Sequence, residues 1–158
     1  MKILVASDTH KDTATLATLL EQYSNQVQMV CHLGDHADDL LCFQAKYPAL
    51  TMVAVAGNCD SVLSADAERM LVLPPHRIFL AHGHNHGVKM NLDRLAYYAR
   101  EKDAHACFFG HTHMPAMLWY GSILMLNPGS LGAPRAGNKP SYALVEISDT
   151  ITGEVMYL

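Results

Sequence analysis

Seven side chains of the kinds that bind metal ions stand just beyond apolar segments of this sequence. They are Asp8, His10, Asp35, Asn58, His82, His111 and His113. Asp and Asn offer oxygen atoms and His offers imidazole nitrogen, a combination that suits Mn, Fe, Co, Ni or Zn. Seven ligands are too many for one catalytic ion, but they suit two ions about 3.5–4 Å apart that share a carboxylate. The residue types therefore predict a centre with two divalent metal ions.

The spacing of two ligand pairs favours one shared site. Asp8 and His10 are two residues apart, as are His111 and His113, and an extended backbone would point both members of a pair the same way. Alone, such a pair is weak evidence, because 10 of the 158 residues are His. A single Asp after a strand is also more often a helix cap. The stronger evidence is that ligand types recur after five separate apolar segments.

The elements that would position these residues begin with a βαβαβ pattern. Apolar segments at 2–6, 27–33 and 50–56 alternate with expected helices at 12–24 and 38–46. Continuous apolar strands separated by helices indicate a parallel sheet that is covered on both faces. In such sheets ligands bind beyond the carboxyl ends of the strands. The pattern therefore brings Asp8, Asp35 and their neighbours to one edge.

The second half of the chain predicts further strands and one helix. We expect strands at 69–73, 77–81 and 106–109, a helix at 92–102, and hairpins at 116–120 with 123–126 and at 142–147 with 151–157. A loop rich in Gly and Pro fills residues 127–140. This order of elements predicts two sheets packed together with helices outside.

The composition argues against three classes of protein: binders of extended nucleic acid, membrane proteins and secreted proteins. The net charge is −4, with 11 Lys and Arg against 15 Asp and Glu, which argues against binding to extended nucleic acid. No apolar stretch approaches the ~20 residues of a membrane helix, and the first residues lack a signal-peptide run. The four cysteines show no disulfide pattern, and three of them look buried: Cys31, Cys42 and Cys107. We therefore expect a cytoplasmic protein with no membrane partner.

The motifs SDTH, GD, GNCD, HGH, GHTH and NPGS, in this order, resemble those of the calcineurin-like metallophosphoesterase superfamily. The likeness is greatest to its small bacterial and archaeal phosphodiesterases, and it runs from Ser7 to the loop after Asn127. The resemblance implies an α/β fold, a four-layer αββα sandwich of two mixed β-sheets flanked by helices. It also implies a single metallophosphoesterase domain over residues 1–158.

The resemblance further implies a role for each ligand. Asp8, His10 and His113 would hold the first ion, Asn58, His82 and His111 the second, and Asp35 would bridge both. Mn²⁺ is the favoured ion, with Ni²⁺, Fe²⁺, Zn²⁺ or Co²⁺ as alternatives. Asp35, Asn58 and His82 are the expected catalytic residues. A hydroxide between the ions would attack a small phosphodiester, the expected substrate.

One position departs from many larger relatives, where the Asn is followed by a His that can protonate the leaving group. Here that position is Cys59, and a neutral thiol with a free pKa of about 8.5 is a poor substitute. The departure favours substrates with good leaving groups. A water on a metal ion, His36 or His84 would be the alternative acid. Arg135 could contact the phosphate or lie free in solvent.

Two other functions remain open from the sequence alone. One is a non-catalytic interaction scaffold of the same fold, and the other is a nucleotide-directed phosphodiesterase or nuclease. A homodimer or higher homo-oligomer is common in the subgroup, although no decisive apolar patch is visible in the sequence. The remaining histidines have structural interpretations: His32 within a strand, His76 in a turn, His86 in a surface loop and His105 at the start of a strand.

Overall fold

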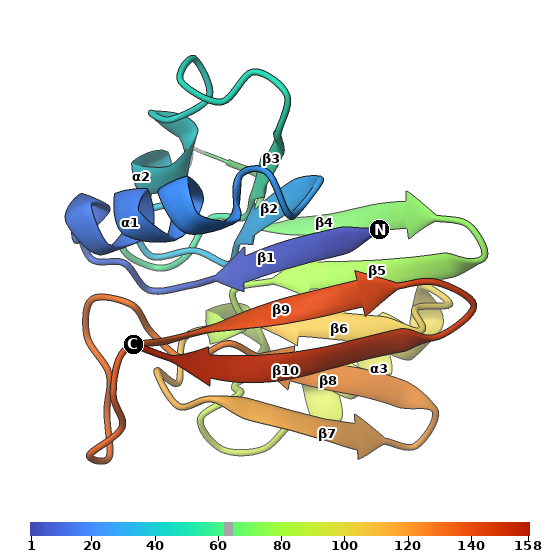
Figure 1. The fold of residues 1–158 in the computed structure, drawn as a ribbon. Coiled ribbons are helices and arrows are strands. Elements are labelled where there is room, and N and C mark those ends of the chain that lie inside the picture. The colour runs from blue at the N-terminus through green and yellow to red at the C-terminus, as the bar shows by residue number, and fades with distance from the viewer. Residues whose placement is uncertain (62–64) are drawn as a thin grey trace.

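The computed structural model describes residues 1–61 and 65–158, and in this part of the chain ten strands form two five-stranded sheets (Figure 1). The first sheet has the order β10-β9-β1-β2-β3 and the second β4-β5-β6-β8-β7. The strands of the first are β1 (Lys2–Ala6), β2 (Met29–His32), β3 (Thr51–Ala54), β9 (Ser141–Ile147) and β10 (Ile151–Tyr157). Those of the second are β4 (Glu68–Leu73), β5 (His76–Ala81), β6 (Ala106–Phe109), β7 (Ala116–Tyr120) and β8 (Ile123–Asn127).

Both sheets are mixed. In the first, β1, β2 and β3 run parallel, whereas β9 is antiparallel to β1 and to β10. In the second, β5, β6 and β8 run parallel, and β4 and β7 add antiparallel edges. The parallel strands of each sheet therefore finish at a common edge, which confirms the arrangement expected from the βαβαβ pattern.

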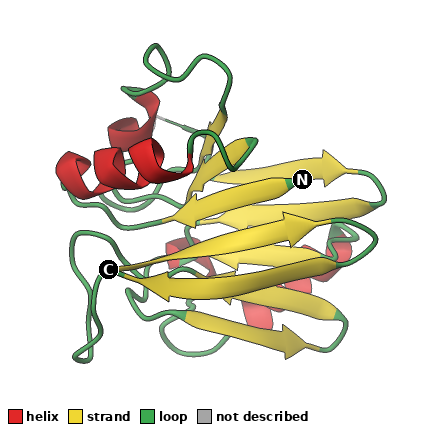
Figure 2. Cartoon of the chain, in the orientation of Figure 1, coloured by secondary structure: helices red, strands yellow, loops and turns green. Residues whose placement is uncertain are grey.

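Four helical segments connect the strands in the described residues: α1 (Thr13–Tyr23), α2 (Asp38–Leu41), the 3-10 helix η1 (His84–His86) and α3 (Asp93–Glu101). In Figure 1, β9 and β10 lie in front of β6 and β8, and α3 lies behind them. Figure 2 shows the helices outside the paired sheets. None of the helices in the described part of the chain is long and apolar enough to span a bilayer.

Three apolar layers show that the fold is the expected four-layer αββα sandwich. Ile3 and Val5 of β1 pack between the sheets, in a cluster with side chains of β5, β6 and β8. Leu4 and Ala6 of the same strand face α1 and α2. A third cluster packs α3 against the outer face of β5, β6 and β8. Because β1 is buried on both faces from Ile3 onward, its sequence from Ile3 to Ala6 is apolar.

The local sequence explains where α1 begins. The Asp12 side chain accepts a hydrogen bond from the backbone N–H of Thr15 at 3.0 Å, which caps the helix. Leu16, Leu19 and Leu20 then recur on one face, and all three are buried. The loop between β1 and α1 carries the first ligand pair. It is anchored by the sheet at one end and by the capped helix at the other.

Three expectations about these elements were wrong. The helix expected at 38–46 ends at Leu41, because the backbone after Cys42 forms tighter turns, such as Phe43 N–H to Leu40 O. Cys42 is exposed rather than buried, since Leu40 faces the core at this point. His76 is the first residue of β5 rather than part of a turn.

Candidate metal centre

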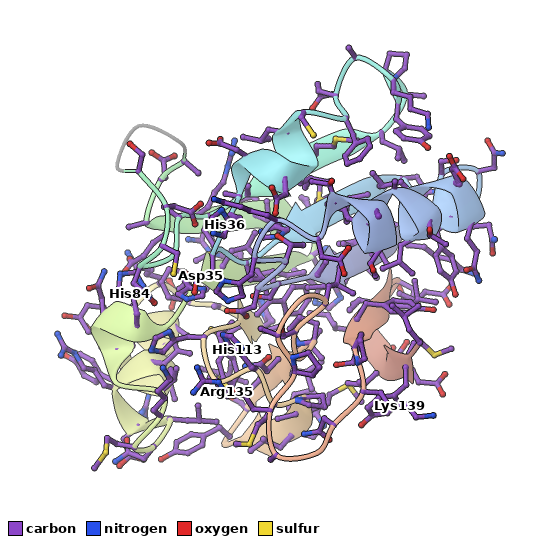
Figure 3. The ribbon with its side chains drawn as sticks, turned by 90° about the vertical axis from the view of Figure 1, so that its left-hand side faces the viewer. Asp35, His36, His84, His113, Arg135 and Lys139 are labelled. Carbon is purple, nitrogen blue, oxygen red and sulfur yellow. The ribbon has the colours of Figure 1, made fainter. Side chains whose placement is uncertain are left out.

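The loops that follow β1, β2, β5 and β6 carry six of the seven expected ligands to one place. Figure 3 shows Asp35, His84 and His113 on the same side of the molecule, with Arg135 beside His113. Asp8, Asp35, His82 and His113 are buried, whereas His10 and His111 are partly exposed. The candidate site therefore consists of two buried carboxylates, Asp8 and Asp35, and the partly exposed His10 and His111 lie between them and solvent.

Asp8, His10, Asp35 and His113 form the first half of the site, and one ligand atom from each lies within 4.8 Å of the others. His113 Nε2 is 3.1 Å from Asp8 Oδ1. His10 Nε2 is 3.6 Å from Asp35 Oδ2 and 3.3 Å from His113 Nε2. These four side chains could hold one metal ion.

His82 and His111 form the second half, next to the same carboxylates. His82 Nε2 is 3.4 Å from Asp35 Oδ1 and 3.9 Å from Asp8 Oδ1. The His82 and His111 rings are 5.0 Å apart between centroids. Asp35 thus has one carboxylate oxygen toward His10 and the other toward His82, which is the geometry that a bridging ligand needs.

Asn58 is the exception among the seven expected ligands. Its side chain is exposed, and its amide Nδ2 lies 3.4 Å from Cys59 Sγ. Its backbone is nevertheless close to the site, because the N–H of Cys59 donates to Asp35 Oδ1 at 2.9 Å. The structure therefore places the residue beside the bridging carboxylate with its amide turned toward Cys59.

The hydrogen bonds of the histidines test whether a metal ion fits. His82 Nδ1 is 2.6 Å from Leu33 O, and His113 Nδ1 is 2.6 Å from Ala133 O. A carbonyl can only accept, so each ring carries its hydrogen on Nδ1 and presents the Nε2 lone pair to the carboxylates. Asp8 Oδ1 and His82 Nε2 are buried without a hydrogen-bond partner. Lone pairs facing carboxylate oxygens in this way fit a divalent cation between them.

The pKa shifts of Asp8 and His111 agree with this fit. Burial would raise the pKa of Asp8, but His113, His82 and Ser7 hold it below its ordinary value. Burial and the neighbouring His82 lower the pKa of His111 to about 4. An ionised carboxylate and a neutral imidazole are the forms that bind metal ions. The pKa of His113 is instead raised by the Asp8 carboxylate, and the same carboxylate would attract a metal ion in place of the proton.

The backbone of the ligand loops is strained. Five of the expected ligands have positive φ angles: Asp8 (53°), His10 (47°), Asp35 (56°), His111 (67°) and His113 (59°). Such angles cost residues other than Gly on the order of 1 kcal/mol or more and persist where the surroundings enforce them. The two ligand pairs therefore reach one site through left-handed turns, and the extended backbone assumed for them was wrong.

Four further residues surround the site. The His36 ring lies 5.7 Å from that of His10, and the His84 ring lies 5.4 Å from that of His82. Arg135 is exposed, and its backbone N–H donates to His113 O at 3.4 Å. Burial and the nearby Asp35 raise the pKa of Cys59. Cys59 is therefore a neutral thiol at pH 7 and a weak acid.

His86 lies elsewhere than expected. It is buried, with Nε2 3.1 Å from Glu68 Oε1 and its ring against those of Phe79 and Tyr98. The interpretation as a surface-loop residue was wrong, because η1 turns this side chain toward α3. Sequence reasoning also missed residues that support the ligand loops: Thr9, Asp39, Asp60 and Ser130. Thr9, Asp60 and Ser130 had a signal, since they belong to the SDTH, GNCD and NPGS motifs, whereas Asp39 had none.

Comparison with known proteins identifies relatives over nearly the whole chain. A family model described as the calcineurin-like phosphoesterase superfamily domain matches residues 1–150. A probable metallophosphoesterase of Bacillus subtilis, YsnB, is 33% identical over 150 residues, covering 94% of this chain and 86% of that protein. The phosphodiesterase YfcE of Escherichia coli is 30% identical over 169 residues, covering 92% of this chain and 88% of that protein.

Solved structures agree with the fold. A conserved protein of Streptococcus pneumoniae, described as a predicted phosphoesterase, superposes with a TM-score of 0.85 at 31% identity, covering 99% of this chain and 88% of that one. Vps29 of Entamoeba histolytica, in complex with zinc, superposes with a TM-score of 0.78 at 23% identity, covering 99% of this chain and 98% of that one. The second likeness concerns the fold alone.

Proposed function

This chain belongs to the calcineurin-like phosphoesterase superfamily, and from that premise we propose that it is a phosphodiesterase that hydrolyses small phosphodiesters with two metal ions. The family is one of metal-dependent hydrolases of ester bonds, and the E. coli relative is named a phosphodiesterase. The observation that carries the proposal is the buried Asp8 Oδ1, which faces His113 Nε2 at 3.1 Å and His82 Nε2 at 3.9 Å, with no hydrogen-bond partner for the latter. A phosphatase activity on monoesters would use the same residues.

The proposed ligand sets follow the two halves of the site. Asp8, His10 and His113 would hold one divalent ion, Asn58, His82 and His111 a second, and Asp35 both. Mn²⁺ is favoured from the family resemblance, and Ni²⁺, Fe²⁺, Zn²⁺ or Co²⁺ could replace it, because mixed carboxylate, amide and imidazole ligands suit all of these ions. When bound, such ions supply an acidified water and positive charge opposite the phosphate oxygens.

Three side chains would have further roles in the reaction: Asp35, Asn58 and Cys59. Asp35 lies between His10 and His82 and would keep the two halves of the site at a fixed separation. The exposed Asn58 amide would turn from Cys59 toward a phosphate oxygen. Since Cys59 is a poor proton donor, the leaving group would depart as a stable anion or take its proton from a metal-bound water, His36 or His84. We therefore expect aryl or similarly acidic leaving groups to be favoured.

A metal-resolved substrate screen tests this function. The protein would be stripped with chelator, reloaded with Mn²⁺, Ni²⁺ or Zn²⁺, and offered matched phosphomonoesters and phosphodiesters. We expect the stripped protein to be inactive and Mn²⁺ to restore hydrolysis of an aryl diester at a higher kcat/KM than that of the monoester. No turnover of any ester by the Mn²⁺-loaded protein would contradict the proposal and support an interaction scaffold.

The two competing functions have less support. A scaffold role has in its favour the fold shared with Vps29, yet all seven ligand-type residues are present here. A nuclease acting on extended nucleic acid would need a positive surface, and the net charge is −4. A short nucleotide diester remains compatible with the proposed site.

We also propose a cytoplasmic homodimer in which residues 1–158 form one metallophosphoesterase domain. The reducing cytoplasm suits the four free cysteines. The structure adds an apolar patch that the sequence did not reveal. Met117, Leu118 and Trp119 of the edge strand β7 are 44%, 40% and 63% exposed. Because an uncharged edge strand can pair with another strand, a second copy of β7 would cover these side chains.

A further inference from the structure

Two acidic residues outside the expected ligand set support the ligand loops. They are Asp39 in α2 and Asp60 at the end of the GNCD motif. Both are half-buried, and the carboxylate oxygens of both accept hydrogen bonds from groups in other loops. Asp39 lies in the short segment 36–39, which follows the ligand Asp35, and Asp60 contacts this segment at Ala37.

Asp39 holds the loop that carries Asp8 and His10. Its Oδ2 accepts hydrogen bonds from the Thr9 hydroxyl at 2.6 Å and from the backbone N–H of Lys11 at 2.9 Å. Thr9 is wholly buried and stands between the two ligands. A single carboxylate oxygen thus fixes the backbone on both sides of His10.

His32 continues this network beneath the site. Its Nε2 lies 3.1 Å from Thr9 Oγ1, and its Nδ1 accepts the backbone N–H of Gly34 at 3.3 Å. Because Thr9 donates its hydrogen to Asp39, it accepts from His32, so the ring hydrogen is on Nε2. The fully buried ring therefore connects the residue before Asp35 to the residue between Asp8 and His10.

Asp60 joins the loops that carry Asp35 and Asn58. Its Oδ1 accepts the backbone N–H of Ala37 at 2.8 Å, and its Oδ2 accepts that of Gly57 at 2.7 Å. Between these two bonds, the N–H of Cys59 donates to Asp35 Oδ1 at 2.9 Å. The two loops are therefore fastened on both sides of the bridging carboxylate.

We propose that Thr9 and Asp60 are positioning residues, which set the separation of the two halves of the metal centre without touching a metal ion. The inference rests on the proposed function, because it presupposes that the centre binds metal. The physical reason is the positive φ of Asp8, His10 and Asp35. Left-handed backbone at such residues persists only where surrounding contacts enforce it, and the hydrogen bonds of Thr9 and Asp60 are the contacts that do so here.

The test measures Mn²⁺ binding to chelator-stripped protein by calorimetry, for variants that differ in one hydrogen bond. Thr9→Val keeps the shape of the side chain and removes the hydroxyl, whereas Thr9→Ser keeps the hydroxyl. We expect Thr9→Val and Asp60→Asn to weaken Mn²⁺ binding about 10- to 100-fold, and Thr9→Ser to bind like the parent. Excess Mn²⁺ should restore kcat in both weakened variants, because the ligands themselves are intact.

Matched controls separate positioning from general loss of structure. Thr18→Val removes a hydroxyl that bonds to Ala14 O within α1, and Asp93→Asn alters a carboxylate that bonds to Tyr120. Both should bind Mn²⁺ like the parent. If Thr9→Val does not fold, Asp39→Asn weakens the same contact by replacing its charged acceptor with a neutral amide, and we expect weaker Mn²⁺ binding there too.

Each remaining outcome decides a different claim. Loss of Mn²⁺ binding in Asp35→Asn, with unchanged binding in Thr9→Val and Asp60→Asn, would overturn this inference and leave the proposed function standing. A parent that binds neither Mn²⁺ nor any of Ni²⁺, Fe²⁺, Zn²⁺ and Co²⁺ would overturn both. Equal weakening in Thr9→Val and Thr9→Ser would also count against the inference, because the hydroxyl would then not be the group that matters.

Discussion

The histidine rings around Asp8 and Asp35 determine what these two carboxylates can bind. Both carboxylates are buried, and the Nε2 atoms of His82 and His113 approach within 3.1–3.9 Å. Since Leu33 O and Ala133 O bind the Nδ1 hydrogens of these rings, the neutral rings present Nε2 lone pairs to the carboxylates. Buried carboxylates are stable as anions when cations compensate them. The outer carboxylate contacts are hydrogen bonds, such as that of the Cys59 N–H to Asp35, and the ring nitrogens fit a metal ion between the two carboxylates.

Cys59 gives the first prediction at this scale. Replacing it with His would place a group with an ordinary pKa near 6.5 where a neutral thiol now stands. We expect Cys59→His to raise kcat for an alkyl phosphodiester by about 10²-fold and to change the rate for an aryl diester little. Parallel kinetics on both esters measure this. An equal change for both leaving groups would contradict a role in proton donation.

His32 gives a prediction about pH. Burial lowers the pKa of this ring from 6.5 to about 4, so the folded protein keeps it neutral while the unfolded chain takes up a proton below pH 6.5. The unfolded state then binds more protons, and stability falls as the pH drops from 6.5 to 4. The full effect is about 3 kcal/mol. Urea unfolding of metal-free protein across this range, compared with His32→Gln, measures it, and equal slopes would contradict the account.

The sequence predicted the ligand residues better than the residues that support them. Asp8, His10, Asp35, His82, His111 and His113 follow strands directly, so their meeting place could be inferred. Thr9, His32 and Asp39 act through hydrogen bonds between loops far apart in the chain. No periodicity marks such contacts. His86 was missed for the same reason, since its partners Glu68 and Tyr98 lie on other elements.

At the scale of elements, the site depends on how closely the ligand loops pack. The loop after β2 and the loop after β3 touch at Gly34 and Gly57. A methyl group at Gly57 would overlap Asp35 Oδ1 and the Asp35 backbone nitrogen. The strands themselves were predictable from their apolar runs. The closeness of these two loops was not, because it depends on the register of β2 against β3.

Gly57→Ala tests this packing. We expect the methyl group to displace Asp35, lowering the free energy of unfolding by about 1–3 kcal/mol and weakening Mn²⁺ binding. Gly121→Ala is the control, because nothing lies within 4 Å of the added carbon, although φ is positive at Gly121 (62°) and not at Gly57. Denaturant unfolding and Mn²⁺ calorimetry measure the two effects. Mn²⁺ binding that is equal in both variants would show that the loops tolerate separation.

At the scale of the whole molecule, the two edge strands of the second sheet differ in how many large apolar side chains they expose. β4 and β7 are its outer strands, and β7 exposes Met117, Leu118 and Trp119 in succession. Met117 also lies beside Gly153 of β10, an edge strand of the other sheet. The apolar patch therefore lies where the edges of both sheets meet, which is where the proposed second copy would pair.

Trp119→Lys tests the proposed dimer. A charged side chain on an edge strand opposes pairing, so we expect the parent to be dimeric and Trp119→Lys to be monomeric by light scattering. Val72→Lys is the matched control, because Val72 is 60% exposed on β4 at the opposite edge, and it should stay dimeric. A monomeric parent, or a dimeric Trp119→Lys protein, would contradict pairing through β7.

The central claim is that Asp35 joins two metal ions into one hydrolytic centre. Its most direct test is the metal content and aryl diester hydrolysis of Asp35→Asn, both measured on one Mn²⁺-reloaded sample. The account predicts that this variant loses Mn²⁺ and activity together, whereas His76→Ala, which alters a histidine that bonds to Ser148 O, keeps both. Full hydrolysis by Asp35→Asn, or full activity in protein shown to hold no metal, would contradict it.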